Sequence, residues 1–107
     1  MDKMICCAAF FGLIAGISTA SLAATAISQK DKTFSQESVA IKAGDKLSFV
    51  NDDTVTHDIS VRTPGGASRP GIVEKPGDEL ELAFDEVGTY QVRCLIHPKM
   101  KMTVDAQ

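Results

Sequence analysis

Three side chains that can bind a metal ion lie close together near the end of the sequence: Cys94, His97 and Met100. His57, far upstream, is the only other histidine. One thiolate, two imidazoles and one thioether are the donors of a trigonal copper site with a long axial Met ligand. The residue types therefore predict a copper ion bound by His57, Cys94, His97 and Met100, and with it one-electron transfer.

Zinc is the main alternative metal for such residues. Structural zinc sites usually have four Cys or His ligands, often arranged as Cys-x-x-Cys pairs, and this chain has no such pair. A soft thiolate favours copper, and a thioether completes a copper site more naturally than a zinc site. The donor set therefore favours copper over a purely structural zinc domain.

The first quarter of the chain has the layout of a secretory signal peptide. A short, weakly basic start is followed by an uncharged apolar run over residues 5–17, and Ala24-Thr25-Ala26 offers an A-x-A cleavage site. The apolar run is short for a membrane-spanning helix, so an uncleaved anchor is the weaker alternative. We expect export to the periplasm with removal of residues 1–26, which leaves residues 27–107 as a single copper-binding domain.

Export would leave Cys94 as the only cysteine of the mature domain, because Cys6 and Cys7 lie inside the leader. A thiol without a disulfide partner is unusual in an oxidising compartment. A bound metal keeps such a sulfur deprotonated and occupied. The cysteine count thus supports metal ligation by Cys94.

The formal net charge is −3, and loss of the leader does not change it, because Asp2 and Lys3 leave together. No basic block indicates nucleic-acid binding, and no basic amphipathic helix indicates a membrane surface. We therefore expect no nucleic acid and no stable membrane association after cleavage. We also expect a monomer. A mildly acidic protein could steer a basic partner.

Beyond the leader, short runs of alternating apolar and polar residues are bounded by turn residues, and no long segment has a helical period. They predict strands over residues 39–41, 47–50, 55–61, 80–84, 89–93 and 102–106, with a loop over 63–71. Such a series is typical of an all-β, antiparallel β-sandwich. His57 shares its strand face with Ile59 and Val61, and Cys94 shares its face with Tyr90 and Val92, so both should point inward.

A family resemblance rests on three motifs. The motifs are Gly88-Thr89-Tyr90-Gln91-Val92-Arg93-Cys94-Leu95-Ile96-His97, which fits Gly-x-Tyr-x-x-x-Cys-x-x-His, then Phe49-Val50-Asn51 with His57-Asp58-Ile59, and Ala43-Gly44-Asp45. In these motifs the chain resembles the cupredoxins, the type 1 blue-copper proteins, and within them the plastocyanin, pseudoazurin and amicyanin group. The resemblance implies a Greek-key β-sandwich and one copper ion, with His57, Cys94, His97 and Met100 as ligands.

The resemblance also bears on which methionine is axial. The His97-to-Met100 spacing is similar to the short amicyanin loop, whereas plastocyanin and pseudoazurin spacing would select Met102. In both family loops a valine of the final strand follows the axial Met by four residues, and Val104 stands in that relation to Met100. Met100 is therefore favoured, with Met102 as the alternative.

One position departs from the group. The residue after the first histidine is commonly Asn, and here it is Asp58. In the family this residue helps to tie the ligand loops together and points its backbone N–H at the Cys sulfur. Asp58 can keep the backbone contact, but it adds a charge near the copper.

The resemblance implies a periplasmic electron carrier, not an enzyme, that cycles Cu(I)/Cu(II) between larger redox proteins. By analogy, a dehydrogenase is the donor and a c-type cytochrome the acceptor. Apolar residues around His97, namely Leu95, Ile96, Pro98 and the Pro64-Gly65 loop, would suit transient docking.

A periplasmic copper chaperone or storage protein is the alternative function. Such proteins usually expose Met- or His-rich tracts, and this chain has only two His and, after the leader, two Met. An enzyme would need an open coordination position and nearby acid–base groups. Four protein ligands and no spare histidine argue against that role.

Overall fold

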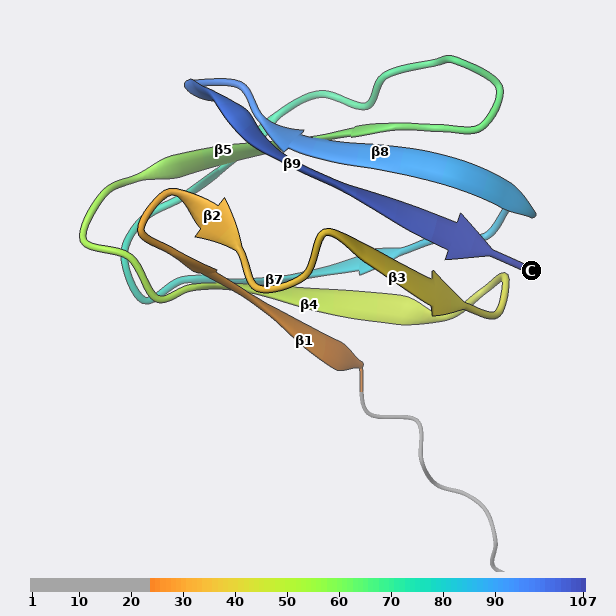
Figure 1. Cartoon of the computed structure of the whole chain (residues 1–107), viewed down its shortest axis with the longest axis horizontal. Coiled ribbons are helices and arrows are strands. Elements are labelled where there is room, and N and C mark those ends of the chain that lie inside the picture. The colour runs from red at the N-terminus through yellow and green to blue at the C-terminus, as the bar shows by residue number, and fades with distance from the viewer. Residues whose placement is uncertain (1–23) are drawn as a thin grey trace, which may run out of the picture.

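The computed structural model describes residues 24–107, which form a sandwich of two β-sheets (Figure 1). The predicted signal peptide lies outside the described residues except for its last three positions. Two of these, Thr25 and Ala26, open strand β1 (Thr25–Lys30) and pair with Leu47 and Ser48. Cleavage after Ala26 stays a prediction, and it would preserve Ile27, the first buried residue of the strand.

Each sheet joins strands that are distant in the sequence. One sheet has the order β2-β1-β4-β7, and the other has the order β3-β9-β8-β5-β6. The remaining bounds are β2 (Thr33–Phe34), β3 (Ser38–Ile41), β4 (Lys46–Asn51), β5 (His57–Arg62), β6 (Ile72–Glu74), β7 (Glu79–Ala83), β8 (Gly88–Cys94) and β9 (His97–Ala106). Between residues 24 and 107, no helix is long and apolar enough to cross a bilayer.

The predicted all-β sandwich is confirmed, but two strand pairs are parallel: β1 with β4, and β3 with β9. Parallel neighbours need a long crossover connection, and alternation within one strand carries no information about the direction of its neighbour. Alternation therefore did not predict these two pairings, and the sequence analysis also missed strands β1, β2 and β6. The closing strand is also longer than predicted, because β9 begins at His97 rather than at Met102.

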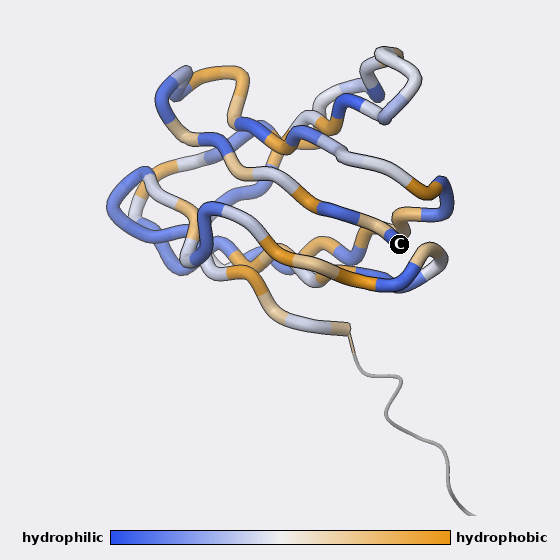
Figure 2. The backbone as a smooth tube through the Cα atoms, turned by 45° about the vertical axis from the view of Figure 1, so that its right-hand side comes forward, coloured by the Kyte–Doolittle hydropathy of each residue, from blue (hydrophilic) through white to orange (hydrophobic). Residues whose placement is uncertain are grey.

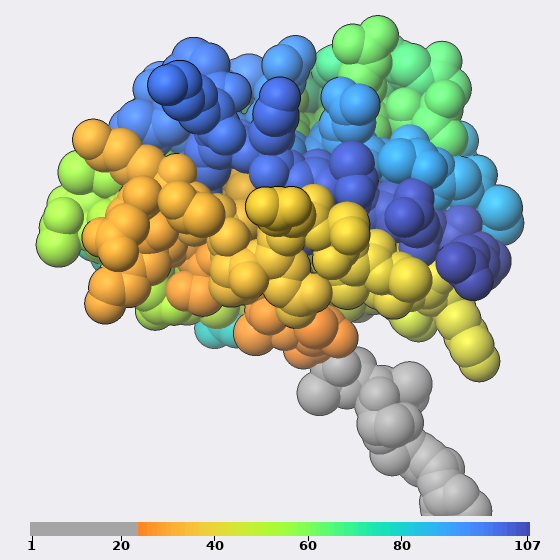
Figure 3. Space-filling model, in the orientation of Figure 1, coloured from red at the N-terminus to blue at the C-terminus, as the bar shows by residue number. Residues whose placement is uncertain are grey.

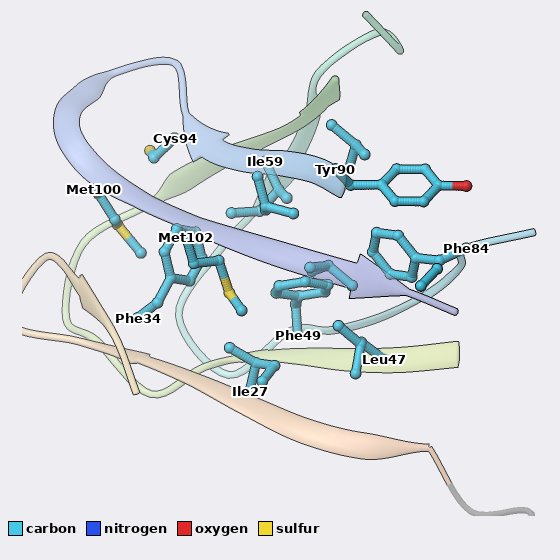
Figure 4. Packing of buried hydrophobic residues seen from close by; sticks show 14 residues of the cluster. Ile27, Phe34, Leu47, Phe49, Ile59, Phe84, Tyr90, Cys94, Met100 and Met102 are labelled. Atoms are coloured by element: carbon cyan, nitrogen blue, oxygen red, sulfur yellow. The ribbon is translucent and has the colours of Figure 1, made fainter. Parts of the chain in front are cut away.

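The core lies between the sheets and is built from their inward-facing alternate residues. Figure 4 shows Ile27, Leu47 and Phe49 from one sheet opposite Ile59 and Tyr90 from the other. The hydropathy colouring in Figure 2 alternates along these strands accordingly. Each large apolar side chain buried in this way contributes about 1.5–3 kcal/mol.

The same core positions Cys94, one of the predicted metal ligands. The predicted inward direction of Tyr90, Val92 and Cys94 is confirmed, since all three are at most 1% exposed. The Tyr90 hydroxyl accepts a hydrogen bond from the Glu86 N–H at 2.8 Å, which anchors β8 at its far end. Cys94 is thus the last residue of a strand that is packed along its whole length.

Candidate metal centre

Three strand ends meet at one end of the sandwich. His57 is the first residue of β5, Cys94 is the last residue of β8, and His97 is the first residue of β9. The antiparallel register places Ile59 opposite Cys94, and the tight turn at Leu95 and Ile96 places His97 opposite Cys94. The ladder pairing therefore brings together three of the four residues that the sequence predicts as ligands, His57, Cys94 and His97.

The three donor atoms form a small triangle. His57 Nδ1 lies 3.1 Å from His97 Nδ1, and Cys94 Sγ lies 3.7 Å from His57 Nδ1 and 3.5 Å from His97 Nδ1. A point equidistant from all three lies about 2.0 Å from each, close to the ~2.0–2.1 Å and ~2.3 Å of metal–nitrogen and metal–sulfur bonds. The arrangement fits one metal ion without rearrangement, and one thiolate with two imidazoles suits copper.

Burial differs among the three side chains. His57 is 0% and Cys94 is 1% exposed, whereas His97 is only partly buried. The core thus shields two of the ligands from water, and the ring of His97 reaches the surface.

Asp53, which the sequence analysis did not single out, orients His57. The Nε2–H of His57 donates to Asp53 Oδ2 at 3.0 Å, so Nδ1 faces Cys94 and His97. The pKa of Asp53 is lowered to about 2, chiefly by the hydrogen bond from the Lys32 N–H, with further contributions from the Thr54 N–H and from His57. The clue in the sequence was a carboxylate four residues before a ligand histidine.

The backbone of Asp58 ties the two ligand segments together, as the resemblance implied. Its N–H donates to Cys94 Sγ at 3.3 Å, and its carbonyl accepts from the Leu95 N–H at 2.8 Å. A hydrogen bond to the sulfur tunes the electronic properties of a thiolate ligand. The carboxylate atom Oδ1 is buried with no partner within residues 24–107, and it fits against Gly71, where a Cβ would collide with it.

The two methionines have different positions on β9. Met102 pairs with Val92 in the regular ladder, which confirms it as a strand residue. Pairing then shifts, because Lys101 opposes Arg93 while His97 already opposes Cys94, and Met100 lies within this irregular stretch. In Figure 4 Met100 lies at the same end of the cluster as Cys94, whereas Met102 projects toward the interior. Met100 is 2% exposed, and its role as fourth ligand stays a prediction.

A buried carboxyl group lies beside the centre. Glu74, which the sequence analysis did not single out, is the last residue of β6 and the register partner of His57. It is 1% exposed, and its Oε1 accepts a hydrogen bond from Gln29 Nε2 at 2.7 Å. Burial is the main reason why the pKa of Glu74 is raised to about 7. Pattern alone did not reveal this residue, because a single Glu before Lys-Pro-Gly-Asp is typical of a solvated turn.

Apolar side chains are exposed around His97. Leu95 and Ile96, at the tip of the β8–β9 turn, are 51% and 53% exposed, and Figure 2 shows this tip as hydrophobic. Val73 on β6, the register partner of Asp58 on β5, is 57% exposed. These three residues, with Ile72, are called the apolar tip below.

The expectation that the Pro64-Gly65 loop contributes to this surface is wrong. Strand β5 starts at the centre with His57 and runs away from it, so the loop that follows lies at the other end of the sandwich. There Pro64 lies against Gly88, the first residue of β8, while the centre adjoins Cys94, its last residue.

Comparisons with known proteins agree with this geometry. Residues 21–107 match the model of a family described as copper binding proteins, plastocyanin/azurin family. Amicyanin from Paracoccus versutus (Thiobacillus versutus) is 22% identical, with a TM-score of 0.72 over 85% of this chain and 86% of that chain. A Cu(I) form of an amicyanin variant is 23% identical, with a TM-score of 0.71 over 78% of this chain and 82% of that chain. These structures share the two-sheet fold.

Proposed function

Because the chain belongs to the plastocyanin/azurin family of copper-binding proteins, we propose that it is a small electron carrier and not an enzyme. A bound copper ion would supply the one-electron chemistry by cycling between Cu(I) and Cu(II). The observation that carries the proposal is the triangle of His57 Nδ1, Cys94 Sγ and His97 Nδ1, with sides of 3.1 to 3.7 Å.

The protein's own part is to hold the ligands still. His57 is held through Asp53, Cys94 through the Asp58 N–H, and His97 through its pairing with Cys94. A carrier reacts fast when its ligands move little between oxidation states. In this proposal Met100 is the long axial ligand that completes the site.

Transient docking at the apolar tip supports the carrier role over storage. Leu95 and Ile96, exposed in the turn directly before the partly buried His97, provide apolar surface that suits a small contact that forms and breaks quickly. By analogy with the family, a dehydrogenase would deliver electrons and a c-type cytochrome would accept them.

We place the carrier in the periplasm, on the strength of the signal-peptide pattern in residues 1–26. Periplasmic extracts of an expressing cell should contain a protein whose N-terminal residue is Ile27. Recovery of the uncleaved chain from membranes would contradict this location.

The direct test is spectroscopic. Addition of Cu(II) to the purified protein should produce an intense visible thiolate-to-copper absorption, which ascorbate bleaches and a mild oxidant restores. Cys94→Ser should abolish the colour, and Ser60→Ala, on the neighbouring strand, should not. A colourless protein that prefers zinc would refute the proposal, and copper uptake without reversible reduction would favour the chaperone or storage alternative.

A further inference from the structure

Two cations oppose each other directly on the outer face of the larger sheet. Arg93 on β8 and Lys101 on β9 are register partners, and both side chains are exposed. Like charges in this relation destabilise a β-ladder. In the part of the chain from Ala24 onward, neither side chain forms an ion pair with a carboxylate. The sheet therefore tolerates an unfavourable pair at this position.

The cations lie close to the metal centre along the chain. Arg93 directly precedes Cys94, and a third exposed cation, Lys99, lies on β9 between His97 and Lys101. A shallow groove is lined by all three cations, together with Glu37, Gln91 and Thr103. We call Arg93, Lys99 and Lys101 the basic surface.

A second depression shares Lys99 with this groove and includes His97. It is lined by Lys32, Thr33, His97, Pro98, Lys99 and Met100. Figure 3 shows the N-terminal strands, in orange, against the start of β9, in blue, at this end of the molecule. Lysines therefore flank His97 on two sides, from β9 and from the turn before β2 (Thr33–Phe34).

The local charge is opposite in sign to that of the whole molecule. The chain carries a net charge of −3, yet the groove has three cations and only one carboxylate, that of Glu37. Charges act over about 8–10 Å at moderate ionic strength, so a partner that docks on this face experiences the cluster directly. Of the carboxylates beside the centre, that of Asp53 is already hydrogen-bonded to His57 and to the Lys32 N–H, and that of Asp58 fits against Gly71. Net charge suggested a basic partner, and the placement of these residues suggests the reverse.

We propose that the basic surface is the docking site for an acidic redox protein, which it orients so that the apolar tip and His97 meet the partner's redox centre. The inference rests on the proposed carrier function. The cations are exposed and spread over two strands beside apolar residues, which matches the charged rim and apolar centre of a transient protein interface. Charges in such a rim act mainly on the association rate.

Electron exchange with small reagents of opposite charge tests the sign of the local field. Oxidation of the Cu(I) protein by hexacyanoferrate(III) should slow as ionic strength rises, despite the net negative charge of both reactants. Oxidation by the tris(phenanthroline)cobalt(III) cation should not slow in this way.

Arg93→Glu and Lys101→Glu should each reduce the low-salt rate with hexacyanoferrate(III) by about three- to tenfold. Lys42→Glu, an equal charge change on the turn after β3, should change it by less than about twofold.

Binding and stability provide readouts that need no electron transfer. Amide resonances of residues near Arg93, Lys99 and Lys101 should shift on titration with an acidic c-type cytochrome, and not with a basic one. The shifts should disappear in Arg93→Glu. That variant replaces a repulsive pair with an attractive one, so its melting temperature should be equal to or above that of the wild type.

The docking surface is supported if Arg93→Glu slows electron exchange with hexacyanoferrate(III) without a loss of stability. The variant must also lose the amide resonance shifts that the acidic cytochrome induces. Shifts confined to the apolar tip, or rates that follow net charge and ignore Arg93→Glu, overturn it while leaving the carrier function intact. Shifts caused by hexacyanochromate(III) alone, without any by the acidic cytochrome, would indicate a small-anion site and also overturn it. A copper protein that exchanges electrons with neither reagent refutes the carrier function itself.

Discussion

Asp53 Oδ2 accepts a hydrogen bond from His57 Nε2 at 3.0 Å, so the buried imidazole presents Nδ1 to Cys94 and His97. The carboxylate is itself held by the Lys32 and Thr54 N–H groups. Carboxylate partners of this kind fix the tautomer and the ring orientation of ligand histidines. The turn between β4 and β5 is therefore part of the metal centre, although it contributes no ligand.

Replacement of Asp53 should weaken metal binding. Asp53→Ala frees the His57 ring and is expected to lower copper affinity by about 10- to 100-fold, measured by competition with a chelator. Asp53→Asn keeps an acceptor oxygen and should have a smaller effect. Asp52→Asn, at the neighbouring exposed position, serves as the control, and equal losses in the two Asn variants would exclude a specific role for Asp53.

The two methionines can be separated by matched substitutions. Met100→Leu should alter the visible spectrum and raise the reduction potential, because it removes a weak axial donor. Met102→Leu should leave both nearly unchanged and cost less than about 1.5 kcal/mol of stability, since it conserves volume in the core. Absorption spectroscopy and voltammetry of both variants provide the measurements. A larger spectral change in Met102→Leu would assign the axial position to Met102.

The buried Glu74 should make the stability of the metal-free protein depend on pH. Its pKa is about 7 in the folded protein and 4.5 in the unfolded chain, so the folded state holds the extra proton between these values. Stability should therefore fall as pH rises from about 4.5 to 7, by at most about 3 kcal/mol. The carboxylates of Asp78 and Glu79 add to the penalty on the charged form.

Glu74→Gln should remove this dependence, and the difference between the pH profiles of wild type and variant isolates the contribution of residue 74. An amide at position 74 can also donate to Gln29 Oε1, which lacks a partner among residues 24–107. Urea denaturation at pH 5 and pH 8 measures the effect, with the exposed Glu86→Gln as control. If Glu74→Gln retains the wild-type slope, another group is responsible.

The backbone conformation at the start of β8 requires a glycine at position 88. Its φ is +134°, and a Cβ there would lie 2.7 Å from Pro64 Cβ. Gly88→Ala should therefore destabilise the protein by about 1–3 kcal/mol, seen as a lower melting temperature, with the copper spectrum unchanged. At Gly65 an added Cβ meets only Thr63 Oγ1 at 4.0 Å, so Gly65→Ala should be nearly neutral. Equal destabilisation by both changes would contradict this explanation.

Much of the site could be predicted from the sequence because ligand chemistry depends on residue type. Cys94, two His and a nearby Met favour copper by their donor types, and alternation around Tyr90 and Cys94 predicts which side chains point inward. The motif around Cys94 then indicates the family, which the match over residues 21–107 confirms. These are local properties, because they depend only on residue type and on spacing along the chain.

Only the tertiary structure decided what depends on neighbours far apart in the chain. The parallel pairing of β1 with β4 and the opposition of Arg93 to Lys101 arise from register between strands, and the burial of Glu74 against Gln29 arises from the packing of one sheet on the other. Alternation specifies the face of a residue but not its cross-strand partner. The sequence by itself thus determined which metal the protein is suited to hold, and the packing of the sheets decided how the ligands are supported and which charges surround them.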